Sequence, residues 1–267
     1  MKENEIILKL LADTIQYINK RTLLIIYELL TEELRNSYHT LEYLFIKNID
    51  TKLARVVINK NNSVLNVGCG LPINEIIFRS WGVKKVVGID IDKEVIEKGK
   101  SWLQKLNIDN VELHVGDALN IDYPDNSFDV VVSFSAIEHV QGWKNYEKWI
   151  KEMSRVAKKY IVLTTSNRKN WIIYVLSKLF PHSYYEYFFT PEQIERLLLK
   201  HNLKIVHFET NTLMCNEYIP LPDKFKYNIL TLRLNIFLDQ MREKFLKNYG
   251  GRMGFIGVKN FRTKASV

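Results

Sequence analysis

The feature that most constrains this chain is a regular alternation of short apolar, β-branched runs with helical patterns, which begins at Ser63. The predicted strands are Ser63–Val67, Lys85–Asp90, Val111–Val115, Phe128–Phe134, Tyr160–Thr165, Leu203–Glu209 and Arg252–Lys259, and the predicted helices are Ile73–Ser80, Lys93–Leu106, Trp143–Ala157 and Pro191–His201. Strands this apolar belong to a parallel sheet that helices cover on both faces. The sequence therefore predicts an α/β fold with a doubly wound, seven-stranded and mostly parallel sheet.

The segment before this alternation differs from it, because residues 1–67 contain neither glycine nor proline. Apolar residues there recur at helical spacing, at Ile7, Leu11, Ile15, Ile18, Ile25 and Leu29. We expect residues 1–60 to form an added N-terminal helical segment that packs on a domain at 61–260. That domain would carry helical inserts at about 168–189 and 210–250, and residues 261–267 would form a tail.

The composition indicates a folded protein of a reducing compartment. Hydrophobic residues make up 46% and aromatic residues 12% of the chain, which excludes a disordered protein. Cys69 and Cys215 are too few for a disulfide scaffold, and no zinc-ligand spacing accompanies them, so no metal site is predicted. Because the N-terminus lacks a signal-peptide pattern and no apolar run approaches ~18 residues, we expect a soluble cytoplasmic protein.

The net charge of +8 lies in the last part of the chain. Residues 224–267 hold ten Lys and Arg against two acidic residues, whereas residues 1–223 are neutral overall. A solvated helix face is the ordinary interpretation of this asymmetry, and an anionic partner, RNA or a lipid surface, is the alternative that it suggests. Within this segment, a predicted helix at Tyr227–Lys247 carries an apolar stripe formed by Leu230, Leu234, Phe237, Met241 and Phe245.

We expect this helix to dock on its own domain. As a basic amphipathic helix it has two alternatives, which are to lie on a membrane surface or to meet RNA phosphates. The insert at Trp171–Phe180 is also very apolar. It is expected to cover the active site or to touch lipid, since ten residues are too few to span a bilayer.

Small and acidic residues follow the first three predicted strands. Gly68, Cys69 and Gly70 follow the first strand, Asp90 ends the second, and Asp117 follows the third. Glycines permit a sharp turn close to a ligand, and an acid twenty residues further on is placed to accept hydrogen bonds from a ribose. Because the carboxyl ends of parallel strands share one edge, these residues predict a nucleotide-type site. The ordinary alternatives are that Asp90 caps the next helix and that Asp117 only forms a turn.

Four motifs occur in order along this part of the chain: SVLNVGCG at 63–70, VGIDI at 87–91, VGDA at 115–118 and FDVVVSFSAIEHV at 128–140. With them, residues 62–260 resemble class I S-adenosylmethionine-dependent methyltransferases of the broad small-molecule group. The resemblance implies that the last strand, after its helix-bearing insert, runs antiparallel. It also implies S-adenosyl-L-methionine as the cofactor and an O or N atom of an unidentified small molecule as the acceptor.

The resemblance assigns the methionine half of the cofactor to the first and fourth strands. The loop Gly68–Gly70 would line the methionine and ribose, and Ser133 would lie near the methionine moiety. Two residues depart from the family pattern. Asn66 stands where an acid usually faces the methionine ammonium, and Pro72 replaces a third glycine, although proline suits the first turn of a helix.

The adenosine half is assigned to the second and third strands. By resemblance, Asp90 would hold the ribose hydroxyls and Ile91 would pack on the adenine. Asp117 would accept a hydrogen bond from the adenine amine, with Ala118 beside it.

A sulfonium methyl is already activated, so the enzyme needs in-line positioning and, for a protonated acceptor, a base. His139, just after the fourth strand, is the best base candidate because an imidazole titrates near neutral pH, with a packing role as the alternative. His182, Tyr184 and Tyr185 are expected to pack, with part of a substrate lid as the alternative. Residues 134–136 lack the Asn/Asp-Pro-Pro-aromatic signature of amino-methylating DNA enzymes, so no DNA acceptor is expected.

Three alternative functions stay open from the sequence. A nicotinamide dehydrogenase would need a glycine at position 73, where this chain has Ile73. A non-catalytic methyltransferase-like scaffold would bind a partner through the basic C-terminal segment. A methyltransferase acting on RNA or lipid would use the same segment.

Overall fold

The computed structural model describes residues 17–34, 40, 43–45, 47–180, 185–211 and 222–259. The predictions that concern residues 1–16, His182, Tyr184, Cys215 and the tail at 261–267 lie outside the described residues.

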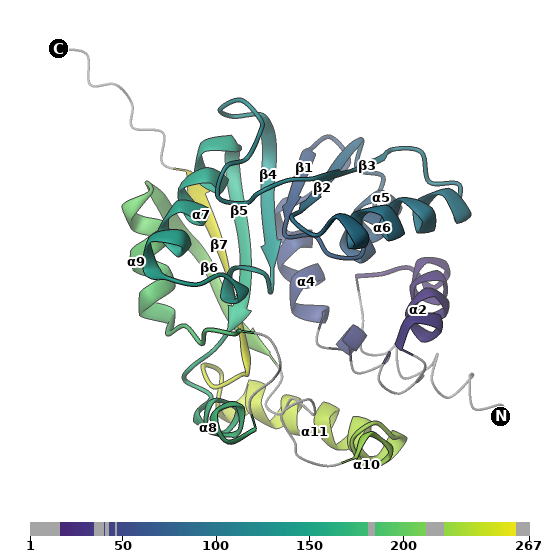
Figure 1. Cartoon of the computed structure of the whole chain (residues 1–267). Coiled ribbons are helices and arrows are strands. Elements are labelled where there is room, and N and C mark those ends of the chain that lie inside the picture. The colour runs from purple at the N-terminus through teal and green to yellow at the C-terminus, as the bar shows by residue number, and fades with distance from the viewer. Residues whose placement is uncertain are drawn as a thin grey trace.

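The sheet has seven strands in the order β3-β2-β1-β4-β5-β7-β6 (Figure 1). Their bounds are β1 Ser63–Val67, β2 Lys85–Asp90, β3 Val111–Val115, β4 Phe128–Phe134, β5 Ala157–Ser166, β6 Leu203–Asn211 and β7 Arg252–Lys259. Strands β1 to β5 pair in parallel, and β7 pairs antiparallel with both β5 and β6. The predicted doubly wound, mostly parallel sheet with an antiparallel last strand is confirmed.

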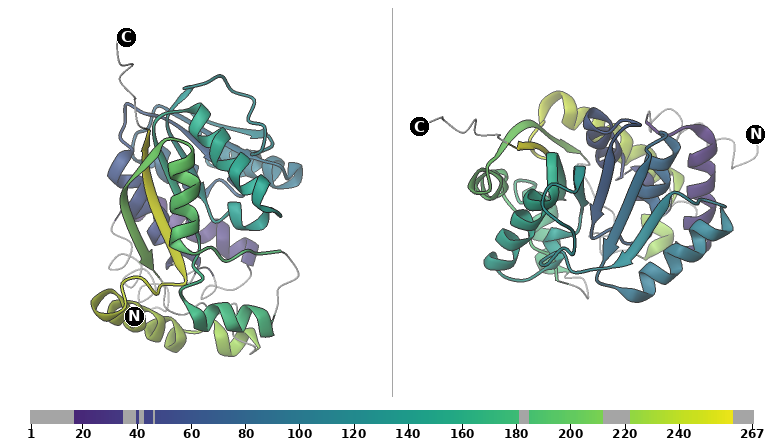
Figure 2. Two further views of the ribbon diagram at one scale, coloured as in Figure 1. Left: turned by 90° about the vertical axis from the view of Figure 1, so that its left-hand side faces the viewer. Right: turned by 90° about the horizontal axis from the view of Figure 1, so that it is seen from above.

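Helices cover both faces of this sheet, as the two further views in Figure 2 show. The described helices are α2 Lys20–Leu34, α4 Asn48–Val57, α5 Ile73–Ser80, α6 Lys93–Lys105, the 3₁₀ helix η1 Ile137–His139, α7 Trp143–Val156, α8 Trp171–Leu179, α9 Pro191–Lys200, α10 Asp223–Lys226 and α11 Ile229–Phe245. Side chains of α4, α5 and α6 form the core on one face, with α2 packed outside α5, and α7 and α9 form the core on the other. Strand residues supply alternate side chains to the two cores, which is why the strands read as continuous apolar runs.

The chain marks several helix starts with capping side chains. Asp92 accepts hydrogen bonds from the backbone N–H groups of Glu94 and Val95 and caps α6. Thr190 and Gln193 form a capping box at α9, where Pro191 occupies the first helical position. These caps satisfy backbone donors that a helix start leaves without partners, so they set where each helix begins.

Helix α11 packs on the domain, as expected, but not through its apolar stripe. Leu232, Asn235 and Arg242 are buried, whereas all five residues of the stripe predicted for this helix are exposed. Helices α8 and α11 lie at the end of the molecule toward which β4 and β5 point (Figure 1). Within the described residues, none of the helices combines the length and the hydrophobicity needed to cross a bilayer.

Candidate active site

A pocket of about 490 Å³ opens at the carboxyl ends of the parallel strands. It is lined by Gly68, Gly70, Asp90, Ile91, Gly116, Asp117, Ala118, Leu119, Ser135, Ala136, His139, Val140 and Trp149. The loops after β1, β2, β3 and β4 therefore meet in one hollow. This is the edge of an open α/β sheet where ligands bind.

The turn after β1 needs its glycines. Gly68 and Gly70 have φ angles of +70° and +56°, a region that side chains disfavour. A Cβ atom on Gly68 would lie 2.5 Å from Cβ of Ala136, in the loop after β4. A Cβ atom on Gly70 would meet nothing within 4 Å. The turn thus presses against the β4 loop at Gly68 and leaves open space at Gly70.

Asp90 ties the β1 and β2 loops together. Its Oδ2 accepts a hydrogen bond of 2.9 Å from the backbone N–H of Gly70, and its Oδ1 accepts one of 3.0 Å from that of Asp92. The alternative that Asp90 caps the following helix is wrong, because Asp92 is that cap. Asp90 instead lies on the pocket wall as a carboxylate acceptor, and each of its oxygens keeps lone pairs for further donors.

One side of the pocket is formed by Ile91 and the loop after β3. Ile91 is 75% exposed, which is unusual for an isoleucine and offers an apolar face to a flat ring. Oδ1 of Asp117 accepts a hydrogen bond of 2.8 Å from the N–H of Leu119. Asp117 therefore does form a local turn, as the alternative held, while it also lines the pocket beside Ala118.

A buried polar pair adjoins the β1 loop. Nδ2 of Asn66 donates a hydrogen bond of 2.7 Å to Oε1 of Glu75, and both residues are buried. Burial raises the pKa of Glu75 from 4.5 to about 7. Oε2 of Glu75, Oδ1 of Asn66 and Oγ of Ser133 have no hydrogen-bond partner. Buried polar atoms without partners are uncommon, and these three adjoin the β1 loop without lining the pocket.

His139 stands on the pocket rim at the end of η1. Its Nδ1 lies 3.0 Å from the backbone carbonyl oxygen of Tyr185. A carbonyl only accepts hydrogen bonds, so Nδ1 carries the proton and Nε2 carries the basic lone pair of the neutral ring. The neighbouring Glu138 is buried, its pKa is raised by burial, and its Oε2 accepts a hydrogen bond of 3.0 Å from Oγ1 of Thr165.

The structure brings most of the predicted site residues together. The pocket is lined by Gly68, Gly70, Asp90, Ile91, Asp117, Ala118 and His139. Asn66, Cys69 and Ser133 are buried and do not line it. Burial raises the pKa of the Cys69 thiol far above its usual range, so this side chain is not a thiolate near neutral pH.

Sequence reasoning missed the pocket residues Ser135, Ala136 and Trp149, and also Glu75, which is buried next to Asn66 and does not line the pocket. Ser135 and Ala136 directly follow β4, so their position at the strand end was a usable signal. Glu75 sits among isoleucines in the helix INEIIFRS, where an acid in a buried stretch was also a signal. Nothing local marks Trp149, which reaches the pocket from α7.

The pocket fits an adenosine-bearing sulfonium cofactor by its donor set. It combines carboxylate acceptors at Asp90 and Asp117, an exposed apolar face at Ile91, and the Nε1 group of Trp149, which has no hydrogen-bond partner. In the part of the chain that the structure describes, no three His, Cys, Asp or Glu side chains gather as metal ligands.

Comparisons with known proteins agree on one family. A family model described as "Methyltransferase domain" matches residues 58–208, more than half of the chain. A demethylmenaquinone methyltransferase of Bacillus cereus is 35% identical over an alignment of 118 residues, and the match covers 39% of this chain and 48% of the relative. The uncharacterized methyltransferase YcgJ of Bacillus subtilis is 30% identical over 95 residues, 36% of each chain. The chain thus spans less than half the length of these curated relatives.

Solved structures extend the likeness over most of the chain. The structure of YcgJ from Bacillus subtilis covers 79% of this chain and 97% of its own, with a TM-score of 0.56 and 19% identity. Magnesium protoporphyrin IX methyltransferase from Synechocystis PCC 6803 with bound SAH covers 83% and 85%, with a TM-score of 0.58 and 13% identity. At such identities the likeness concerns the fold. Together with the family match, it establishes that this chain belongs to the methyltransferase-domain family and has the class I, Rossmann-like methyltransferase fold.

Proposed function

We propose that this protein transfers a methyl group from S-adenosyl-L-methionine to an O or N atom of a small-molecule acceptor. The observation that carries the proposal is the convergence of Gly68, Asp90 and Asp117 on one pocket at the carboxyl edge of the sheet. The demethylmenaquinone methyltransferase among its relatives supports a small-molecule acceptor. A cytoplasmic location and an anionic partner for residues 224–267 remain predictions in addition to the proposed methyl transfer. DNA is not the expected acceptor.

In this proposal the protein's residues hold the cofactor and the acceptor in place, and the cofactor supplies the reactive group. S-adenosyl-L-methionine, when bound, brings a methyl group that is already activated by its sulfonium. Asp90 binds the ribose hydroxyls, Asp117 accepts from the adenine amine, and Ile91 covers the ring. The turn at Gly68 and Gly70, which lines the pocket, would hold the methionine side, and the buried Ser133 would lie near the methionine moiety. Alignment of acceptor and methyl within such a pocket lowers the barrier by several kcal/mol, up to ~7–11 in ideal cases.

Glu75 takes over the charge that Asn66 lacks. The Asn66 side chain donates to Oε1 of Glu75, and the second carboxyl oxygen of Glu75 has no hydrogen-bond partner. A nearby cation lowers the pKa of a buried carboxyl because its attraction offsets the desolvation of the carboxylate, and a carboxyl with a pKa of about 7 changes its charge near neutral pH when this happens. We therefore propose that Glu75, acting beside Asn66, stabilises the methionine ammonium.

Calorimetric titration separates this function from its alternatives. The full chain is expected to bind one molecule of S-adenosylmethionine or S-adenosylhomocysteine and not to bind NADH. A non-catalytic scaffold predicts no heat with S-adenosylmethionine at hundreds of micromolar, and a dehydrogenase predicts binding of NADH instead. Either of these results would overturn the proposal.

His139 is proposed as the base for an acceptor that loses a proton. Replacement by glutamine is expected to lower kcat by about 100-fold, within the range that general bases contribute, and to leave the affinity for S-adenosylmethionine unchanged. The readout is the rate of S-adenosylhomocysteine formation against pH once an acceptor is found. Loss of the acidic limb of that profile in His139→Gln supports the role. An unchanged profile would assign His139 to packing against the backbone of Tyr185.

A further inference from the structure

Exposed hydrophobic side chains concentrate at the α8 and α11 end of the molecule. Among the described residues, nineteen large hydrophobic side chains are exposed, and twelve of them lie within residues 171–180 and 225–249. The twelve are Trp171, Val175, Leu179, Phe180, Phe225, Leu230, Leu234, Phe237, Met241, Phe245, Leu246 and Tyr249, which we call the α8–α11 surface. Isolated exposed hydrophobics are normal, but a cluster of this size marks an interaction site.

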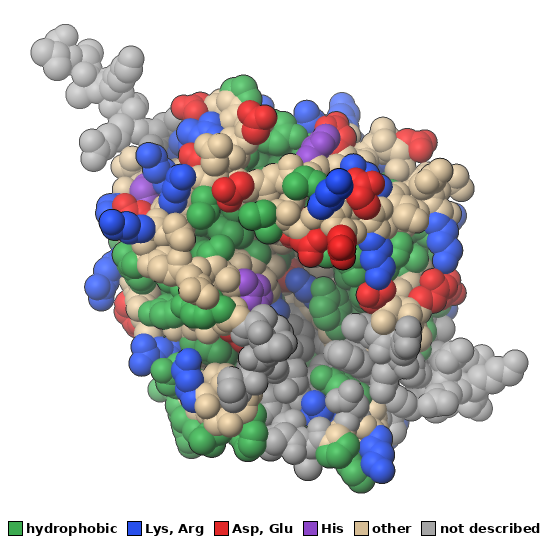
Figure 3. Space-filling view, viewed as in Figure 1, with side chains coloured by type: hydrophobic (Ala, Val, Ile, Leu, Met, Phe, Trp, Pro, Cys, Tyr) green, Lys and Arg blue, Asp and Glu red, His purple; other side chains and the backbone are tan. Residues whose placement is uncertain are grey.

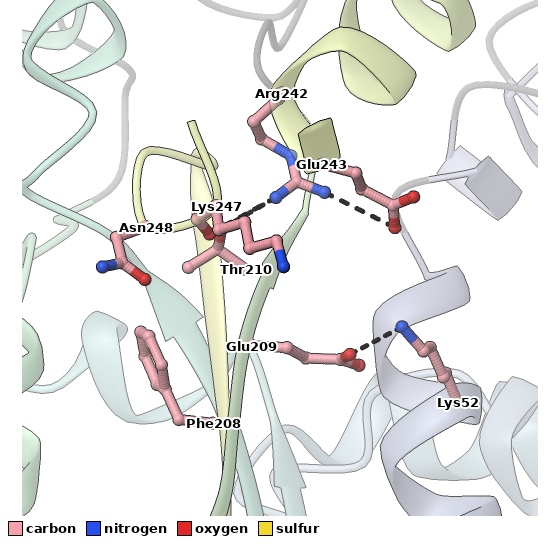
Figure 4. A pocket seen from close by; sticks show the side chains of 8 residues that line it. All are labelled: Lys52, Phe208, Glu209, Thr210, Arg242, Glu243, Lys247 and Asn248. Carbon is pink, nitrogen blue, oxygen red and sulfur yellow. Dashed lines mark hydrogen bonds and ion pairs between the residues drawn. The ribbon is translucent and has the colours of Figure 1, made fainter. Parts of the chain in front are cut away.

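The orientation of α11 is fixed by buried contacts on its opposite side. Arg242 is only 2% exposed, and its Nη1 donates a hydrogen bond of 3.1 Å to Oγ1 of Thr210 on β6. Its Nε donates one of 2.6 Å to Oδ1 of Asp239. Figure 4 shows Arg242 reaching toward β6 in the hollow between β6, α4 and α11, where Lys52 also pairs with Glu209 at 2.6 Å. The buried, paired Arg242 lies with Leu232 and Asn235 on the side of α11 that meets the domain, so the apolar stripe faces outward.

The charges at this surface are almost all positive. Exposed basic side chains on the same segments are Lys178, Lys224, Arg233, Lys244 and Lys247, whereas Glu243 is the exposed acid among the described side chains of 171–180 and 224–249. Figure 3 shows hydrophobic side chains at the lower end of the molecule, over α8 and over the α10–α11 segment, with Lys and Arg at their margins. Lysines beside apolar side chains bury their methylene stems and keep their ammonium groups among anionic headgroups.

We propose that the α8–α11 surface docks this protein on the face of an anionic lipid bilayer. Two exposed helices with aromatic, aliphatic and basic side chains match the composition of a peripheral membrane anchor. An RNA partner would use the basic residues but would leave the aliphatic stripe of α11 uncovered. A second copy of the chain would bring the same positive charge to the contact, with little acid to balance it. The anionic bilayer satisfies both the apolar and the basic side chains.

Co-sedimentation of the full chain with sucrose-loaded vesicles tests this proposal without any cofactor or acceptor, so its result is independent of methyl transfer. We expect binding to vesicles of phosphatidylcholine with 30% phosphatidylglycerol (about a third anionic lipid, enough to draw basic segments) and weak binding to pure phosphatidylcholine. Replacing Leu230 and Phe237, which are 74% and 56% exposed, by serine is expected to weaken the partition by about tenfold or more. The matched control replaces two exposed hydrophobics outside the surface, Leu199 and Val206, by serine.

A second pair of variants tests the charge. Arg233→Gln with Lys244→Gln is expected to reduce binding to the anionic vesicles by about tenfold or more, since each basic residue contributes about 1 kcal/mol at such a surface. Lys84→Gln with Lys204→Gln, at exposed positions by the amino ends of β2 and β6, is the control and is expected to bind as the natural chain does. Absence of sedimentation with anionic vesicles, or equal loss in surface and control variants, would overturn the proposal. The proposal would also be overturned if the natural chain formed a dimer that dissociates only in the Leu230 and Phe237 variant, or if the chain bound RNA but not vesicles.

Discussion

Replacement of Asp90 by alanine is expected to weaken binding of S-adenosylmethionine by about 100-fold, which corresponds to the loss of hydrogen bonds to one charged acceptor. Asp90 lines the pocket, and its Oδ2 also accepts from the N–H of Gly70. The variant therefore loses the ribose contact and loosens the glycine turn at once. Calorimetric titration of the folded variant gives the change in Kd.

Asp92→Ala is the matched control, because this carboxylate is two residues away and caps α6 without lining the pocket. It is expected to cost about 1 kcal/mol of stability and to change the Kd only a few-fold. A cofactor analogue without ribose hydroxyls separates the two roles of Asp90. The affinity of this analogue for the natural chain should be low, and Asp90→Ala should lower it little further, because removal of the hydroxyls and removal of the carboxylate abolish the same interaction. Additive losses would reject the ribose contact.

The strands of this fold were predictable because burial on both faces leaves a simple signature. The runs at Ser63–Val67, Lys85–Asp90, Val111–Val115 and Phe128–Phe134 coincide with β1 to β4 residue by residue. The fifth predicted strand is Tyr160–Thr165, whereas β5 begins at Ala157, because the polar lysines before Tyr160 conceal the start of the strand. Position at a strand end then located the glycine and aspartate residues of the pocket, because parallel strands bring their ends to one edge.

What sequence could not supply is which face of a helix meets the body of the protein. Helical spacing correctly grouped Leu230, Leu234 and Phe237 on one stripe, but a stripe can face inward or outward. The direction depends on distant partners, here Thr210 on β6, whose hydroxyl accepts from the Arg242 guanidinium. No local pattern around residue 242 contains that information.

The same limit applies to the charge beside the cofactor pocket. Asn66 alone predicted a site without its usual acid, because the motif around β1 is read along the chain. A carboxyl group that we propose takes this place, Glu75, lies nine residues further on, and the packing of α5 on the sheet brings its Oε1 within 2.7 Å of Nδ2 of Asn66. Recognition of this substitution required the structure.

Glu75→Gln is expected to make the protein more stable and less able to bind cofactor. The pKa of this carboxyl is raised from 4.5 to about 7 on folding, chiefly by burial. Between these two pH values the folded state holds a proton that the unfolded state has released, so stability falls as pH rises, by up to about 3 kcal/mol in all. Glutamine keeps the acceptor for Asn66 and has no charge to bury. Urea unfolding at pH 5 and pH 8 should therefore show a steep loss in the natural chain and a smaller one in the variant.

The same substitution, Glu75→Gln, should weaken the binding of S-adenosylmethionine. If the methionine ammonium approaches Glu75, it stabilises the carboxylate, lowers its pKa and expels a proton on binding near pH 6.5. Calorimetry in buffers of different ionisation enthalpy counts that proton, which we expect for the natural chain and not for Glu75→Gln, together with about tenfold weaker binding by the variant. Glu97→Gln, an exposed carboxyl on α6 paired with Lys100, is the control and should leave the proton count unchanged. Equal proton release and equal affinity in Glu75→Gln would show that Asn66 works without a neighbouring charge, and that Glu75 only packs beneath the sheet edge.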